Sequence, residues 1–152
     1  MSITWRDYIH PPIGNADQRD LQAIEQRIGV TFPQDYKACV AHHQGKSPDK
    51  ETLESGELAA SPFGPLYHLL PNCEGDLKSY GVLNAWQKWS GIYSGLVPIA
   101  DCAGSGCFYA FDFRTNPEQP TIVFVDVEED PEDEDAILFV AHSFTDMINA
   151  LA

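Results

Sequence analysis

Residues 96–141 decide the fold, because they contain four apolar runs: LVPIA at 96–100, GCFYAFDF at 106–113, PTIVFVDV at 120–127 and AILFVA at 136–141. Each run is rich in β-branched or aromatic residues, and turn-forming residues separate it from the next. Short strands joined by brief connections typically pair with their neighbours in the chain. The sequence therefore predicts a central antiparallel β-sheet with meander topology.

Two helices are predicted before this sheet. Residues 17–29 (DQRDLQAIEQRIG) begin with Asp17 as a candidate N-cap and end at Gly29, which suits a helix C-terminus. The apolar residues between them recur at helical spacing: Leu21, Ile24, Ile28. Pro33 suits the first turn of a second helix that stops at Gly45.

Four further segments complete the predicted organisation. Residues 46–64 lack a sustained period and are predicted to form a long surface loop that is mobile or faces a partner. Residues 66–70 are predicted to form a buried strand, and residues 77–89 a helix weakened by Gly81. Ser143 opens a capping box before a C-terminal helix that should pack on the sheet. This order of elements predicts an α+β fold with N-terminal helices and one domain over residues 1–152.

Charge limits the possible partners. The 152 residues include 9 Lys and Arg against 23 Asp and Glu, a formal net charge of −14. Such a surface disfavours binding to nucleic acid or to an anionic membrane and favours a cationic partner. No apolar run is long enough to span a membrane, and residues 1–10 have no signal-peptide pattern, so we expect a cytoplasmic protein with reduced cysteines.

More than half of the excess charge lies in one run, residues 126–135 (DVEEDPEDED). Its eight carboxylates are Asp126, Glu128, Glu129, Asp130, Glu132, Asp133, Glu134 and Asp135. They cannot be buried unpaired, so the run is either a solvated hairpin loop, a partner-binding loop or a weak divalent-ion site. Calcium is not favoured, because the ligand order of an EF-hand loop is absent.

Other candidate chemistry has simpler structural interpretations. The glycines of residues 101–106 (DCAGSG) precede a strand, so a hairpin turn is favoured over a phosphate loop. A zinc site on Cys102 and Cys107 would need two more ligands from a set without zinc-binding spacing: His42, His43, His68, Cys73. Pairing Cys102 with His142, or Asp101 with Asp112, could be drawn as catalysis, but nothing orients either pair. We therefore expect no catalytic residue, no metal and no cofactor.

Spaced residues across nearly the whole chain form a recognisable pattern. The pattern consists of Leu21, Ile24-Glu25, Ile28-Gly29-Val30, Phe32-Pro33, Asp35-Tyr36, Gly45, Leu96-Val97-Pro98-Ile99-Ala100, Gly104-Ser105-Gly106, Asp112 and Ser143-Phe144. It resembles the SUKH superfamily, the relatives of the Smi/Knr fungal cell-wall regulator. The resemblance implies an α+β fold and, for most bacterial members, an immunity protein that neutralises a toxin, often a nuclease.

Charge adds a mechanism to this resemblance. Residues 126–135 are expected to occupy the basic surface with which such a toxin holds phosphates, and residues 46–64 could form a second contact. The alternative is a non-enzymatic intracellular scaffold or regulator of the Smi/Knr type. An enzyme is the third possibility, and it would require Asp101, Asp112 or Cys102 to converge in a cleft.

Overall fold

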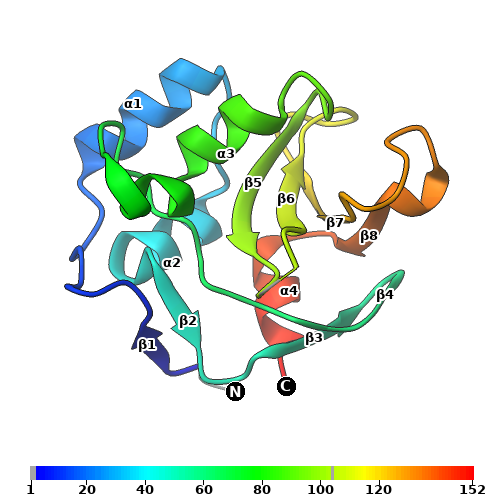
Figure 1. The fold of residues 1–152 in the computed structure, drawn as a ribbon, viewed down its shortest axis with the longest axis horizontal. Coiled ribbons are helices and arrows are strands. Elements are labelled where there is room, and N and C mark those ends of the chain that lie inside the picture. Colours follow the sequence, from blue (N-terminus) through cyan, green and yellow to red (C-terminus); the bar gives the residue numbers. More distant parts are fainter. Residues whose placement is uncertain (1–2, 104) are drawn as a thin grey trace.

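The chain alternates short helices and strands, as the computed structural model describes for residues 3–103 and 105–152 (Figure 1). The elements in chain order are β1 (Trp5–Asp7), α1 (Gln18–Ile28), α2 (Gln34–His43), β2 (Lys46–Pro48), β3 (Thr52–Ser55), β4 (Leu58–Pro62), η1 (Gly75–Tyr80), α3 (Val82–Trp89), β5 (Leu96–Asp101), β6 (Phe108–Asp112), β7 (Thr121–Val125), η2 (Glu134–Ala136), β8 (Ile137–Ala141) and α4 (Phe144–Asn149). Both η elements are 3-10 helices. No helix within the described ranges has the length and apolarity needed to cross a membrane.

The strands form antiparallel sheets, which confirms a mixed α and β structure. β5, β6, β7 and β8 pair in chain order, with Tyr109 opposite both Ala100 and Phe124. Two further pairs, β1 with β2 and β3 with β4, form separate two-stranded sheets among the described residues. The prediction of a single central sheet missed these pairs, because their strands are only three to five residues long and carry no clear alternation.

Both faces of the four-stranded sheet are buried at β5, β6 and β7, whereas the first three residues of β8 are half-buried. Along each strand, side chains alternate between the faces, so Ile99, Tyr109 and Phe124 belong to the main core. The opposite face has its own cluster, in which Phe108 and Val125 lie beneath Tyr93. α3 packs against β5, and α4 packs against β7, β8 and α2. Burial on two sides explains why these strands read as continuous apolar runs.

Three of the predicted helices are present with the expected ends. The Asp17 carboxylate accepts the backbone N–H of Arg19 at 2.7 Å at the start of α1, and Gly29 ends the helix with φ +87°. α2 begins directly after Pro33. The Ser143 hydroxyl accepts the backbone N–H of Asp146 at 3.1 Å, which caps α4.

Residues 46–64, which we call the strap, are ordered by the fold and do not form the predicted mobile loop. They contain β2, β3 and β4, and they run out to the β8 side of the sheet and back (Figure 1). Glu57 N–H donates to the carbonyl of Phe139 on β8 at 2.7 Å, and Gly64 N–H donates to Asp101 on β5 at 2.9 Å. The strap thus contacts both outer strands of the sheet, and its contacts with different elements explain the lack of one sequence period.

The predicted strand at residues 66–70 is buried but forms no regular strand; it makes isolated bridges, Leu66 with Ala100 and His68 with Gly81, and backbone hydrogen bonds to neighbouring segments. The predicted helix at residues 77–89 is also divided, since η1 ends at Tyr80 and α3 begins at Val82. Gly81 separates them because its backbone is extended, with φ −100° and ψ 138°. A Cβ at this position would lie 2.9 Å from Cε1 of the buried His68 ring, so packing against the histidine requires a glycine at the start of α3.

Candidate partner-binding surface

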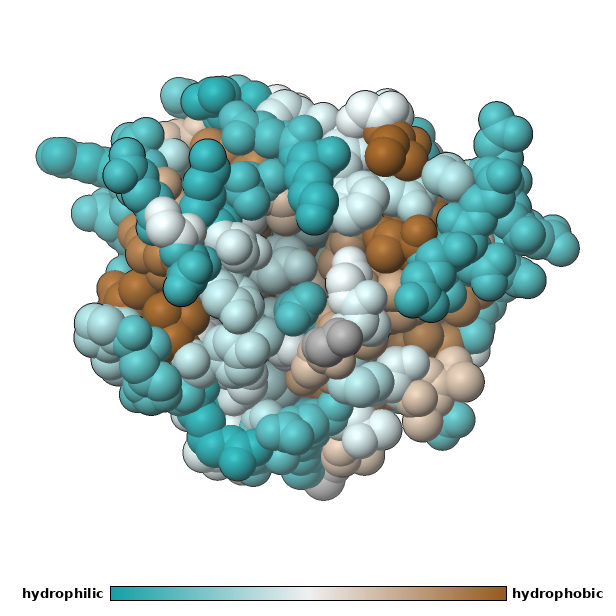
Figure 2. All heavy atoms as spheres, viewed as in Figure 1, coloured by the Kyte–Doolittle hydropathy of each residue, from teal (hydrophilic) through white to brown (hydrophobic). Residues whose placement is uncertain are grey.

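The acidic loop, residues 126–135, connects β7 to β8 and protrudes from one side of the molecule (Figure 1). Every residue from Glu128 to Asp135 is exposed, whereas Asp126 is half-buried at the base. Figure 2 shows hydrophilic side chains protruding on the same side. The eight predicted residues are therefore brought together on one exposed projection.

Three aspartates hold the backbone of this loop. Oδ1 of Asp126, of Asp130 and of Asp133 each accepts a backbone N–H two residues further on, at 3.0 Å in every case. Carboxylates in such Asx turns fix the local backbone and are partly satisfied by it. The glutamates at 128, 129, 132 and 134 make no such bond within the described residues. The loop thus contains three aspartates that shape it and four glutamates that are free to meet a partner.

The base of the loop is tied to the sheet. Sγ of Cys107 donates to Oδ1 of Asp126 at 3.5 Å, and the backbone N–H of Asp126 donates to the carbonyl of Ala136 at 2.8 Å. Val127 packs against both core clusters. These contacts set the position of the loop relative to β6, β7 and β8.

The carboxylates of the acidic loop are not neutralised locally. Within the described ranges, none of the eight forms an ion pair with Lys or Arg. The described residues contain no group of three or more His, Cys, Asp and Glu arranged to hold a metal ion. Subtracting these eight charges from −14 leaves −6 for the rest of the chain, so the loop dominates the electrostatic field on its side.

The turn between β3 and β4, which we call the strap tip, lies beside β8, the strand that follows the acidic loop. Oε1 of Glu57 accepts the backbone N–H of Phe139 at 2.7 Å, while the N–H of Glu57 donates to the carbonyl of the same residue. Gly56 makes this approach possible, because a Cβ there would lie 2.5 Å from the Phe139 carbonyl oxygen. Both segments that the sequence marked as partner-facing therefore contact or adjoin β8.

The two aspartates considered as an acid and base pair lie apart. Asp101 pairs with Phe108 at one end of the β5–β6 ladder, and Asp112 pairs with Leu96 at the other end. Burial raises the pKa of Asp101. Burial opposes ionisation of Asp112 as well, but hydrogen bonds and charge from Arg114 lower its pKa overall. The two carboxylates do not face one reacting group.

The candidate cysteine chemistry also finds no shared site. Cys102 lies next to Ser105 and Cys107 at the β5–β6 turn, whereas the His142 ring packs on Phe139 with centroids 4.9 Å apart. Burial raises the pKa of both Cys102 and Cys107, which disfavours the thiolate form. The predicted hairpin turn joins β5 to β6, and its residue Gly104 lies outside the described residues.

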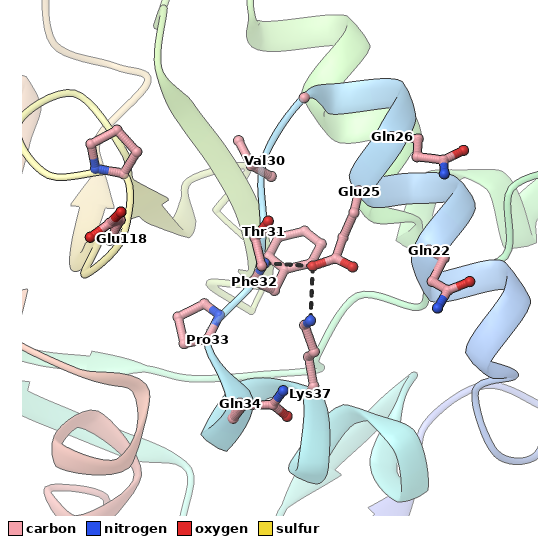
Figure 3. A pocket seen from close by; sticks show the side chains of 12 residues that line it. Gln22, Glu25, Gln26, Val30, Thr31, Phe32, Pro33, Gln34, Lys37 and Glu118 are labelled. Carbon is pink, nitrogen blue, oxygen red and sulfur yellow. Dashed lines mark hydrogen bonds and ion pairs between the residues drawn. The ribbon is translucent and has the colours of Figure 1, made fainter.

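A groove beside the link between α1 and α2 was not predicted (Figure 3). Its volume is about 990 Å³, and Glu25 and Lys37 lie in its wall. Oε2 of Glu25 accepts the backbone N–H of Phe32 at 2.7 Å and pairs with Nζ of Lys37 at 3.1 Å. Both side chains are less than one-fifth exposed, so this pair fixes the link between the helices. The sequence indicated the link between Gly29 and Pro33. It did not indicate Glu25, the α1 residue one turn earlier whose carboxylate anchors that link.

Comparison with known proteins supports the predicted resemblance. The family model described as the SMI1 / KNR4 family (SUKH-1) matches residues 15–150. No curated protein matches the chain. The match begins before α1 and ends at α4, so it includes the four-stranded sheet and the acidic loop. Because this match spans nearly the whole chain, the protein belongs to the SMI1 / KNR4 family (SUKH-1).

Proposed function

We propose that this chain is a non-enzymatic immunity protein that binds and neutralises the basic toxin domain of a bacterial toxin system. The observation that carries the proposal is the acidic loop, which presents eight carboxylates on one projection without a neutralising cation among the described residues. Family membership supports it, because bacterial relatives of this type include immunity proteins. A protein partner with a concentrated basic surface is the complement of such a loop.

Inhibition by this route requires occupancy and no chemistry. A toxin that cleaves nucleic acid uses Lys and Arg to hold phosphates. The four free glutamates of the acidic loop can pair with those cations and exclude the substrate. The net charge of −14 also steers the encounter, which raises association rates by about 10 to 10³ at low salt.

Strand β8 supplies an apolar neighbour to this charge. Ile137, Leu138 and Phe139 on β8 are only half-buried, and Glu57 holds the strap against Phe139. Protein interfaces commonly combine an apolar centre with a charged rim. We therefore propose β8 and the strap tip as the second contact, next to the acidic loop.

The first experiment is co-purification of the tagged protein with the product of its neighbouring gene. The affinity of any complex is then measured calorimetrically at two salt concentrations, and toxicity is assayed with and without the protein. We expect a complex that weakens at high salt and abolishes toxicity. A partner without toxicity would instead support the alternative scaffold function of the Smi/Knr type.

A charge-reversed variant tests the role of the acidic loop directly. It keeps the three turn-forming aspartates and carries four Glu→Lys substitutions, at Glu128, Glu129, Glu132 and Glu134. The matched control reverses four exposed acids outside both proposed contacts and changes the net charge equally: Asp7, Glu74, Glu118 and Asp146. We expect the first variant to lose affinity by at least about 100-fold and the control by much less.

Two results would contradict this assignment. Equal losses in both variants would show that only net charge matters and that the loop is not the contact. Unchanged affinity and salt dependence in the loop variant would exclude the loop from the interface. Circular dichroism of both variants separates either result from misfolding.

A further inference from the structure

A second hollow lies beside the chain that follows β1. That part of the chain lies on the opposite side of the molecule from the acidic loop (Figure 1). Its volume is about 430 Å³, within the range of small-ligand pockets. The residues that form its walls and matter here are Tyr8, Pro11, Pro12, Asp76, Leu77 and Tyr80. Neither the acidic loop nor the strap contributes to it.

Two aromatic rings form one side of this pocket. Tyr8 and Tyr80 meet edge to face, with ring centroids 5.4 Å apart and an interplanar angle of 69°. Tyr8 is 45% exposed, so a large aromatic side chain is left open to solvent at the rim. Hydrogen bonding to Tyr8, burial and nearby charges raise the pKa of Tyr80 to about 12.

The charge in the pocket is negative. Asp76 is exposed, lines the pocket and forms no ion pair or hydrogen bond with any described residue. The lining includes the imidazole of His10 but no Lys or Arg. The charge of Asp101 also acts on the Tyr80 hydroxyl from the neighbouring β5. Lys78 is two residues from Asp76 on η1, and its charge acts instead on Cys73.

We propose that this pocket binds an arginine side chain of a protein partner. A guanidinium group is planar, so it can stack on the Tyr8 ring while it donates hydrogen bonds to the Asp76 carboxylate. The proline walls and Leu77 cover the apolar stem of such a side chain. A phosphate or carboxylate would be repelled by Asp76, and an uncharged apolar group would gain no electrostatic attraction from it. The site is independent of the proposed function, because it uses neither the acidic loop nor the toxin.

The probe is N-acetyl-arginine amide, titrated into the ¹⁵N-labelled full chain at constant ionic strength and followed by NMR. Saturable shifts are expected in the amides of Tyr8, Asp76, Leu77 and Tyr80. N-acetyl-citrulline amide has the same shape without the charge, and it should bind at least about tenfold more weakly.

Substitutions in the pocket complete the test. Asp76→Asn should weaken binding of the arginine probe by at least about fivefold, and Tyr8→Ala should weaken it similarly. Glu74→Gln is the matched control, because it removes an equal charge two residues away without altering the pocket lining, and it should change binding by less than about twofold. Circular dichroism of each variant checks folding.

Several outcomes would overturn the proposal. They are absence of saturable shifts, equal binding of citrulline amide, insensitivity to Asp76→Asn, or shifts confined to the acidic loop. None of these results bears on the toxin complex, whose assay uses the partner protein itself. A failure of the pocket is therefore distinguishable from a failure of the proposed function.

Discussion

The acidic loop leaves nearly all of its side chains in water, whereas the strap buries Leu53, Leu58 and Phe63 beneath the sheet. The loop is held by hydrogen bonds that its own backbone N–H groups donate to its own aspartates. The strap is held by contacts with β5, β8 and the C-terminal residues, including a bridge between Leu53 and Leu151. The conformation of the acidic loop is therefore set by local hydrogen bonds, and the loop is free to bind a partner. The strap, by contrast, is part of the core.

This difference has a consequence for mutation. Substitutions in the strap should change the free energy of unfolding, because they remove buried contacts. Substitutions of the loop glutamates should change partner binding and leave stability nearly constant. Four predictions test this division, ordered from the largest expected effect to the smallest.

Phe63→Ala should lower the free energy of unfolding by about 3–5 kcal/mol. Phe63 is 2% exposed and packs on Tyr109, with ring centroids 4.9 Å apart, so its removal leaves a cavity under the sheet. Urea denaturation of the purified variant measures the loss. Glu54→Ala is the exposed control in the same hairpin and should cost less than about 0.5 kcal/mol. Equal stability of the two variants would mean that the strap is not part of the core.

Gly56→Ala should cost about 1–3 kcal/mol. The residue has φ +57°, and the added Cβ would meet the Phe139 carbonyl at 2.5 Å, which is backbone and cannot move away cheaply. Gly75→Ala is the matched control, because Gly75 has φ +68° and no atom within 4 Å of the Cβ position. The excess loss in Gly56→Ala measures the contact with β8. A difference near zero would contradict the close approach of strap and sheet.

Acid should weaken the segment that follows the strap through His68. Nε2 of His68 donates to the Leu77 carbonyl at 2.7 Å, Nδ1 accepts the Leu70 N–H at 3.2 Å, and burial lowers the pKa of the ring. The unfolded chain therefore takes up the proton first, and stability should fall as the pH drops below about 6.5, by at most about 1.4 kcal/mol per pH unit. Above that pH the contribution is constant.

Denaturation of the wild type and of His68→Gln between pH 7.5 and 5.5 measures this effect. The variant should show a shallower pH dependence, and His42→Gln, at an exposed position, should retain the slope of the wild type. Identical slopes in all three proteins would show that the buried imidazole does not control acid sensitivity.

Neutralising the loop glutamates should have the smallest effect on stability. Replacement of Glu128, Glu129, Glu132 and Glu134 by Gln should change the free energy of unfolding by less than about 0.5 kcal/mol. The direction should be toward greater stability at low salt, since like charges repel. Thermal unfolding at two salt concentrations checks both points. A large loss would mean that the glutamates, and not only the aspartates, hold the loop.

Much of the fold could be predicted because the signals are local. Asp17 and Ser143 cap their helices through hydrogen bonds to nearby residues. The strands at 96–141 can be recognised from their β-branched and aromatic composition. The strap could not be predicted as core, because its apolar residues serve different neighbours and share no period. Similarly, the wall of the α1–α2 groove contains the ion pair of Glu25 with Lys37, which lie on two different helices.

The sequence by itself determined the mixed fold class, the ends of α1, α2 and α4 and the concentration of charge in residues 126–135, since these depend on composition and short-range spacing. Only the tertiary structure decided that the strap is ordered, that its tip lies against β8 and that Tyr8 and Tyr80 meet Asp76 across a pocket. Such contacts join residues far apart in the chain, so they form and stabilise the protein only when the chain between them has folded.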